Sequence, residues 1–173
     1  MTTTKSMSFV AIGLCVLTGI AWAQPQAPTK IVNNTYTAPE TTEPVIYSSK
    51  DAITEGFEKG NLMLHDSHGS YMVETAKRDM PGGAEVHLMD TDVTYIIKGS
   101  ATIITGGTVV GINPHSPTRP GNPHPEYEIR GARIVGGQAF HLSAGDSIVI
   151  PKGMPHQFSD VHGPFWSFNV KVR

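Results

Sequence analysis

The run Gly-Asp-Ser-Ile-Val-Ile-Pro-Lys-Gly-Met-Pro-His, residues 145–156, decides the fold. Ser147–Ile150 is a short β-branched segment, which predicts a strand. Pro151 and Gly153 follow it directly and predict a tight turn. His156 stands just beyond that turn. The stretch therefore predicts a β-rich domain in which His156 follows a tight turn and lies close to the end of a strand.

Segments of the same kind recur through residues 61–173. Each is short, rich in β-branched or aromatic residues, and bounded by Gly or Pro. They are residues 71–76, 84–88, 93–97, 100–105, 108–110, 138–142, 147–150 and 165–172. No comparable helical period appears among them. About eight such strands without long parallel crossovers predict an all-β fold, an antiparallel double-sheet jelly-roll barrel.

Two stretches resemble the sequence motifs of the cupin superfamily. Residues 145–156 match the second motif, Gly-x5-Pro-x-Gly-x2-His, at every fixed position, and Gly83 to Gly99 follows the spacing of the first. The first motif departs from the family pattern at two positions. Glu85 stands where the first His of a His-x-His pair is expected, and Asp92 stands where Glu is usual. The resemblance implies a small single-domain cupin of the secreted or periplasmic bacterial type, with one divalent metal ion inside the barrel.

The candidate metal ligands are Glu85, His87, Asp92 and His156. Glu85 and His87 are two residues apart on one predicted strand, so both side chains point to the same face. His87, Asp92 and His156 make a facial set of two imidazoles and one carboxylate. Glu85 is then either a fourth ligand or a catalytic base beside the metal. This donor mix suits Mn, Fe(II), Zn, Ni or Co, and the sequence does not choose among them.

The same residues have structural alternatives. Glu85 can form an ion pair with Arg78, Arg130 or Arg133 in the absence of any metal. A buried histidine that hydrogen-bonds to the backbone is likewise common, which is the alternative for His87.

Residues 1–23 have the pattern of a signal peptide. Lys5 precedes an apolar run, and Ala21-Trp22-Ala23 is a small-x-small cleavage pattern before Gln24. The run is short for a membrane span of roughly 20 apolar residues. We therefore expect export to the periplasm or medium without stable membrane insertion.

Cleavage after residue 23 changes the available chemistry. It removes Cys15, the single cysteine, so the mature chain has no thiolate ligand or nucleophile. It leaves 12 basic against 15 acidic side chains, which gives no electrostatic reason to expect nucleic acid. We therefore expect the mature chain to bind a small molecule.

Residues 24–60 predict an N-terminal arm followed by a short helix. The arm is rich in Pro, Thr and Asn and shows no hydrophobic period up to about Tyr47. Ser48–Lys59 predicts a helix that Ser48 or Ser49 caps. The cupin resemblance implies a homodimer formed through an edge strand, which this arm could cover.

Other polar and aromatic residues receive secondary interpretations. The long Pro- and Gly-rich insert, residues 113–133, is predicted to carry exposed histidines at 115 and 124. His141 is interpreted as a wall or surface residue, and residues 65–68 as a loop. Tyr95 points opposite to Asp92 by strand alternation, so we expect it to pack between the sheets.

A metalloenzyme that acts on a small oxygenated organic molecule is the leading functional hypothesis. The resemblance implies activities such as dioxygenase, lyase, isomerase or epimerase, and the facial ligand set favours oxygenase chemistry. A non-catalytic metabolite-binding barrel is the main alternative. A storage protein of similar fold is a weaker one, because the metal-binding residue types are kept. A serine hydrolase is disfavoured, since no Gly-x-Ser-x-Gly elbow is present.

Overall fold

A computed structural model describes residues 31–32, 35–36, 45–59, 62–65, 69–115, 122 and 124–173. The predicted signal peptide, most of the predicted arm, and residues 66–68 lie outside the described residues. The chain divides into two compact units, residues 1–41 and 42–173, and each is described by itself. In the first unit, β1 (Ile31–Val32) pairs antiparallel with β2 (Thr35–Tyr36).

The second unit consists mainly of antiparallel strands with one α-helix and one short 3-10 helix. In chain order its elements are α1 (Lys50–Lys59), β3 (Met63–His65), β4 (Tyr71–Arg78), β5 (Ala84–His87), β6 (Thr91–Thr105), β7 (Thr108–Val110), η1 (Pro125–Tyr127), β8 (Glu128–Gly131), β9 (Arg133–Val135), β10 (Gln138–Ser143), β11 (Ser147–Ile150) and β12 (His156–Val172).

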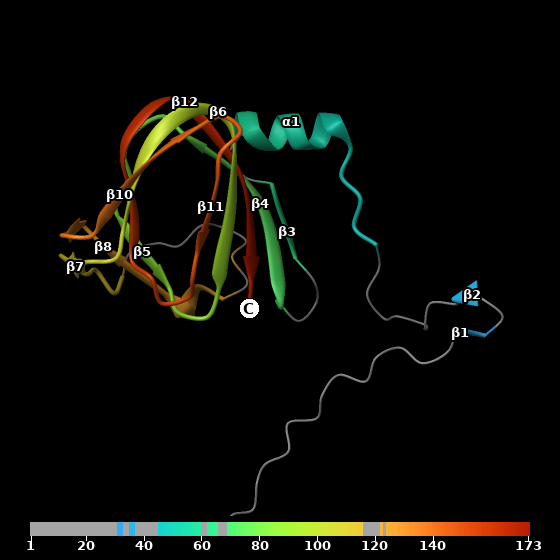
Figure 1. The fold of residues 1–173 in the computed structure, drawn as a ribbon, viewed down its shortest axis with the longest axis horizontal. Helices are drawn as coiled ribbons and strands as arrows, with labels where there is room; N and C mark the ends of the chain where they lie inside the picture. The colour runs from blue at the N-terminus through green and yellow to red at the C-terminus, as the bar shows by residue number, and fades with distance from the viewer. Residues whose placement is uncertain are drawn as a thin grey trace, which may run out of the picture. The chain divides into compact units, whose positions relative to one another are not determined.

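The long strands β6 and β12 run through both layers of the barrel. The first half of β6 pairs with β11 and its second half with β10, while β12 pairs with β5 at its start and with β4 near its end. One layer, sheet I, therefore has the order β11-β6-β12-β4-β3. The other layer, sheet II, has the order β10-β6-β12-β5-β8. Figure 1 shows these strands curled around a common interior.

Both long strands change layer at one corner of the barrel. Gly99 lies there with a φ of 77°, and a Cβ atom on it would stand 2.7 Å from the carbonyl oxygen of Pro164 and 2.8 Å from that of His162. The β6–β12 register also shifts between His162 and Trp166. A strand that bends in this way can pass from one sheet to the other. The two strands predicted at residues 93–97 and 100–105 are accordingly one bent strand, and the predicted antiparallel jelly-roll barrel is confirmed.

The apolar core lies between the two sheets, mainly beneath the second half of β6. Its buried members come from β6, β10, β11 and β12. They are Ile96, Ala101, Ile103, Leu142, Ile150, Phe158 and Phe165. The core thus occupies one part of the barrel and leaves the part near β5 to polar side chains.

Helix α1 packs against one end of sheet I (Figure 1). The Ser49 hydroxyl accepts a hydrogen bond from the backbone N–H of Ala52 at 3.2 Å, which is the predicted N-cap. Phe57 stacks on Trp166 with ring centroids 5.1 Å apart and planes inclined by 3°. Among the described residues, no helix has the length and apolarity needed to cross a bilayer.

Gly99→Ala should destabilise the protein more than the same change at Gly136. Both glycines have nearly the same positive φ, 77° and 76°, but a Cβ at Gly136 meets nothing within 4 Å. Gly136→Ala should cost only the conformational strain, about 1–3 kcal/mol. Gly99→Ala adds a clash with two backbone carbonyls that cannot move away. Urea unfolding of both variants measures the difference. Equal losses of unfolding free energy would contradict the close backbone approach at Gly99.

Candidate metal centre

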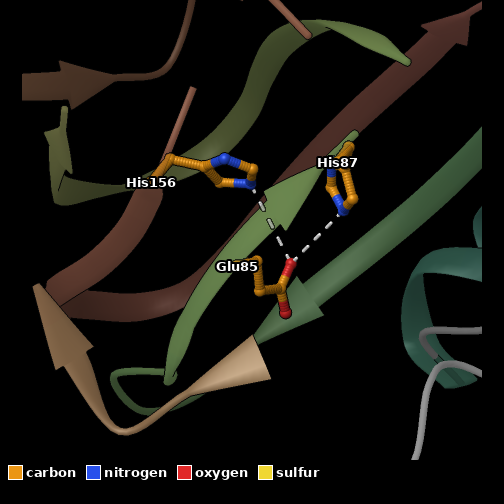
Figure 2. Close-up of side chains that lie close together, drawn as sticks. All are labelled: Glu85, His87 and His156. Carbon is orange, nitrogen blue, oxygen red and sulfur yellow. Dashed lines mark ion pairs between the residues drawn. The ribbon is translucent and has the colours of Figure 1, made fainter. Parts of the chain in front are cut away.

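Two adjoining strands bring three potential metal donors together. Glu85 and His87 are two residues apart on β5, so their side chains lie on the same face of the strand, as the sequence predicted. His156 is the first residue of β12 and pairs directly with Glu85. Figure 2 shows the three side chains converging, with the Glu85 carboxylate between the two imidazoles.

The three donor atoms are spaced for a single ion. Glu85 Oε2 lies 3.8 Å from His87 Nε2 and 4.0 Å from His156 Nε2, and all three donor atoms lie within 4.8 Å of one another. A metal bound about 2.1 Å from each donor in tetrahedral geometry holds ligand atoms about 3.4 Å apart. The two Glu85–histidine pairs therefore need to close by about half an ångström, and the two imidazoles by more if they stand near the 4.8 Å limit. Glu85, His87 and His156 form a group that can hold a divalent ion.

The insert between the motifs contributes a strand to this centre. β8 pairs with β5 so that Glu85 faces Arg130 and His87 faces Glu128. Arg130 Nη1 donates to Glu85 Oε1 at 2.7 Å, while its Nη2 and Nε donate to Glu128 Oε2. The predicted ion pair of Glu85 with Arg130 is therefore present. It holds one carboxylate oxygen of Glu85 and leaves the other directed at the histidines.

Glu128 extends the set of acidic groups at the centre. Its Oε1 lies 3.6 Å from His87 Nε2 and accepts a hydrogen bond from the Asn122 side chain at 2.7 Å. Its side chain is only 7% exposed. The sequence analysis did not single out Glu128. The alternation Glu128-Ile129-Arg130, which mirrors Glu85-Val86-His87 on the paired strand, is the signal that could have found it.

Asp92 lies beside the three donors and contacts the other nitrogen of His87. Asp92 Oδ2 is 2.8 Å from His87 Nδ1 and 3.9 Å from His156 Nε2. The buried Lys171, which the sequence analysis missed, donates to the same oxygen at 2.7 Å and lies 2.9 Å from His87 Nδ1. In the described part of the chain, Asp92 Oδ1 is buried without a hydrogen-bond partner. Asp92 Oδ1 is thus still available as a hydrogen-bond acceptor or metal ligand.

The charges around the centre set the protonation states that a metal requires. Burial alone would raise the pKa of Glu85, but Arg78 and Arg130 outweigh it and lower that pKa to about 2. Burial also raises the pKa of Asp92, and His87 with Lys171 brings it down to about 2. Burial and the neighbouring His87 lower the pKa of His156 to about 4. At neutral pH both carboxylates are ionised and His156 is neutral, the forms in which these groups bind metals.

Three other histidines of the described residues, at positions 115, 124 and 141, are not part of this group of donors. His141 is exposed and hydrogen-bonds to the Thr102 hydroxyl at 2.9 Å. His115 is exposed, as predicted, whereas His124 is half-buried and packs against the ring of Tyr127. The described part of the chain also contains an apolar cavity of about 360 Å³ between β10 and β11, lined by Phe140, Ile148 and Met154 among others. None of the three donors lines it.

Comparison with known proteins gives matches in structure alone. The sequence matches no protein-family model and no curated protein. A hydroquinone 1,2-dioxygenase from Sphingomonas sp. TTNP3 has a similar structure at 13% identity and a TM-score of 0.43, covering 60% of each chain. An L-ribose isomerase from Cellulomonas parahominis matches at 16% identity and a TM-score of 0.39 over 60% of this chain and 49% of the isomerase. Vicilin from Corylus avellana (hazelnut) matches at 14% identity and a TM-score of 0.38 over 59% of this chain and 23% of vicilin.

The chain spans about 60% of the length of the dioxygenase and less of the other two proteins. Matches with identities and TM-scores this low carry no argument about this chain. The assignment therefore depends on features of the chain itself. Its antiparallel strands form two layers that share β6 and β12, Glu85 and His87 of the first motif lie on β5, and His156 of the second motif begins β12 beside them. The chain has an antiparallel jelly-roll barrel fold, in which the residues that resemble the two cupin motifs lie side by side.

Proposed function

We propose that this protein is a metal-dependent enzyme that acts on a small oxygenated organic molecule, with Glu85, His87 and His156 holding the ion. The observation that carries this proposal is the convergence of one ionised carboxylate and two imidazoles, whose donor atoms all lie within 4.8 Å of one another. When bound, the ion supplies Lewis-acid polarisation of a substrate oxygen. Three protein ligands leave coordination positions open for that oxygen, which is the arrangement of catalytic rather than structural sites.

Glu85 is better suited to bind the metal than to act as a base. An efficient general base has a pKa near the working pH, whereas the pKa of Glu85 is lowered to about 2 by the surrounding charges. Arg130 also fixes its Oε1, so that Oε2 is presented to the two histidines. Glu85 thereby takes the place of the first histidine of the usual cupin motif and brings a negative charge to the centre.

Asp92 acts in this proposal through His87. When Asp92 Oδ2 accepts the Nδ1 proton of His87, the lone pair of Nε2 faces Glu85 and is free for the ion. When Lys171 instead donates to Nδ1, the ring proton sits on Nε2 and blocks that ligand atom. Lys171 Nζ also lies 3.3 Å from Nε2, so a hydrogen bond from Lys171 to either ring nitrogen competes with metal binding by His87.

Lys171 also favours a second function, a metal-free barrel that binds a metabolite. Its ammonium group contacts both Asp92 and His87. It therefore balances the negative charge of Asp92, which a divalent ion would balance in a metal-loaded centre. Elemental analysis of the purified protein separates the two functions. Close to one transition-metal ion per chain supports the enzyme, and a metal-free protein that still binds a small oxygenated ligand supports the binder.

Replacement of Glu85 tests the donor set. Glu85→Gln should lower metal affinity by at least about tenfold, because an amide is a weaker donor and the centre loses one negative charge. His87→Ala and His156→Ala should remove most of the metal. His141→Ala is the matched control, since that histidine is exposed on β10 and should change nothing. Titration calorimetry with Zn²⁺ and Mn²⁺ measures the effect, and full affinity in Glu85→Gln would show that Glu85 is not a ligand.

Replacement of Lys171 tests the competition for His87. Lys171→Met should raise metal affinity about tenfold or more, because a cation leaves the centre and Asp92 becomes the sole partner of His87 Nδ1. The metal-free variant should be less stable than the parent, since Asp92 loses its counter-ion, and metal should restore the loss. Lys77→Met, on the outer face of β4, makes the same charge change away from the centre. Unchanged or weaker metal binding in Lys171→Met would contradict this role.

Export is the remaining part of the proposal. The protein recovered from the periplasm or medium should begin at Gln24, because Ala21-Trp22-Ala23 fits the cleavage pattern of a signal peptidase. N-terminal sequencing provides the measurement. Recovery of the protein in the cytoplasm with Met1 intact would refute the assignment.

A further inference from the structure

The apolar cavity between β10 and β11 lies at one side of the barrel. Its volume is about 360 Å³, and no charged residue of the described chain lines it. In the described part of the chain, β10 and β11 each pair with β6 alone, so each strand has one edge without a strand partner. The cavity is therefore bounded by the last strand of sheet I and the last strand of sheet II.

Two side chains of β10 point into the barrel at this cavity. Phe140 lies directly opposite Ile103 on β6, and Leu142 belongs with Ile103 to the buried core. Directly opposite residues lie on the same face of a sheet. Phe140 is nevertheless 37% exposed. An inward-facing phenylalanine with this exposure borders a space that solvent reaches, so the cavity is open on the side of Phe140.

Two side chains of β11 point inward in the same way. Ile148 lies opposite Thr94 and Ile150 lies opposite Asp92, and both of these partners are buried. The positions between them face outward. Tyr95 points away from Asp92, as predicted, but it is 47% exposed on the outer surface, so the prediction that it packs between the sheets is wrong. The cavity thus lies between the inner faces of the two sheets.

The cavity adjoins the candidate metal centre, although none of the three donors lines it. Ile150 is the direct cross-strand neighbour of Asp92. Thr105, which also lines the cavity, is the direct neighbour of His156, and such neighbours have Cβ atoms about 5 Å apart. Met154 lines the cavity as well, and its carbonyl oxygen lies 3.2 Å from His156 Nδ1. A molecule that fills the cavity therefore lies beside the metal centre.

The volume and the lining set the kind of molecule that fits. An apolar cavity of about 150 Å³ binds benzene, so this one has room for a body the size of one or two such rings. Among the described residues that line it, only Thr105 and Ser147 carry side-chain hydroxyl groups. A sugar or a nucleotide would lose water from many polar groups here and gain few partners. The cavity therefore suits an apolar group.

We propose that this cavity binds the apolar body of the substrate, an inference that rests on the proposed function. The substrate is then an oxygenated molecule with an aromatic or branched aliphatic body of about six to twelve carbon atoms. Its oxygen-bearing end lies toward Glu85, His87 and His156. Pockets for small molecules are mostly apolar, with a few polar groups that fix orientation. The cavity supplies the apolar part of that arrangement, and the metal centre supplies the polar part.

Probe binding to the metal-free protein tests the cavity separately from the metal. Benzyl alcohol has an aromatic body and one oxygen, and glycerol is a polar control. Each buried methylene strengthens binding roughly fourfold, so benzyl alcohol should bind at least about 30-fold more tightly than glycerol. In nuclear magnetic resonance titrations it should shift the methyl signals of Ile148, Ile150 and Met154. No shift at these methyl groups, or equal affinity for the two probes, would overturn the proposal.

This experiment also separates the inference from the proposed function. No ion is present, so a failure of the metal centre would leave the titration unchanged. A protein that binds benzyl alcohol in the cavity and holds no metal keeps the cavity assignment and loses the enzyme.

Filling the cavity provides the second test. Ile148→Trp adds bulk inside it and should weaken benzyl alcohol binding about tenfold or more, while Zn²⁺ affinity stays unchanged because Ile148 is not a donor. Phe140→Ser removes one wall at a position that is already exposed, so it should weaken the probe in the same direction with an unchanged circular dichroism spectrum. Val135→Trp is the matched control, since Val135 is 48% exposed in β9 and outside both sheets. Full probe affinity in both Ile148→Trp and Phe140→Ser would contradict the assignment.

A second copy of the chain is the competing occupant of the cavity. Its binding would shift the same methyl signals as the protein concentration rises, before any probe is added. That result would overturn the proposal and assign the cavity to an interface between copies. Signals that do not change with protein concentration but shift with benzyl alcohol support the substrate pocket.

Discussion

The pairing of β6 with β12 is the constraint on which the barrel depends. Their register runs from His156 opposite Thr105 to Val172 opposite Thr91, and each layer of the barrel is built outward from one half of this pair. A slip by a single residue would turn Lys171 and Asn169 out of the barrel and Val170 into it, because side chains alternate along a strand. The corner at Gly99 fixes that register, since a backbone approach this close permits no side chain. The position of the polar groups in the interior thus follows from a backbone contact at the corner.

The interior near β5 is a balance of buried charges. Glu85 and Glu128 share Arg130, and Asp92 is paired with Lys171. Buried charges are tolerated only when they are paired and hydrogen-bonded. Histidines that bind a metal are neutral, so they do not balance the charge of the carboxylates. A divalent ion would therefore add positive charge to carboxylates that already have Arg130 and Lys171 as partners. Each of these buried carboxylates thus already has a cationic partner before any ion binds.

Sequence patterns predicted the parts of this molecule that obey local rules. The alternation that places Glu85 and His87 on one face, the turn that delivers His156, and the N-cap at Ser49 all follow from short-range spacing. The bend at Gly99 was not predicted, because it arises from contact with residues more than sixty positions away. Lys171 was not identified from the sequence for a different reason. Residues 166–172 alternate as a strand with a buried apolar face would, and only the tertiary structure shows that the polar half points inward. Such departures from the usual alternation concentrate at functional or strained sites in proteins.

Strand β8 has an evolutionary consequence. It comes from the long insert between the two motifs, pairs with β5 at the edge of sheet II, and contributes no residue to the apolar core. Connecting segments tolerate insertion and substitution better than the elements they join. Yet Arg130 and Glu128 on this strand set the orientation and charge of Glu85 and the surroundings of His87. Divergence within the insert could therefore retune the chemistry of the barrel while the framework stays unchanged, and related chains with identical motifs could differ in metal preference through this one strand.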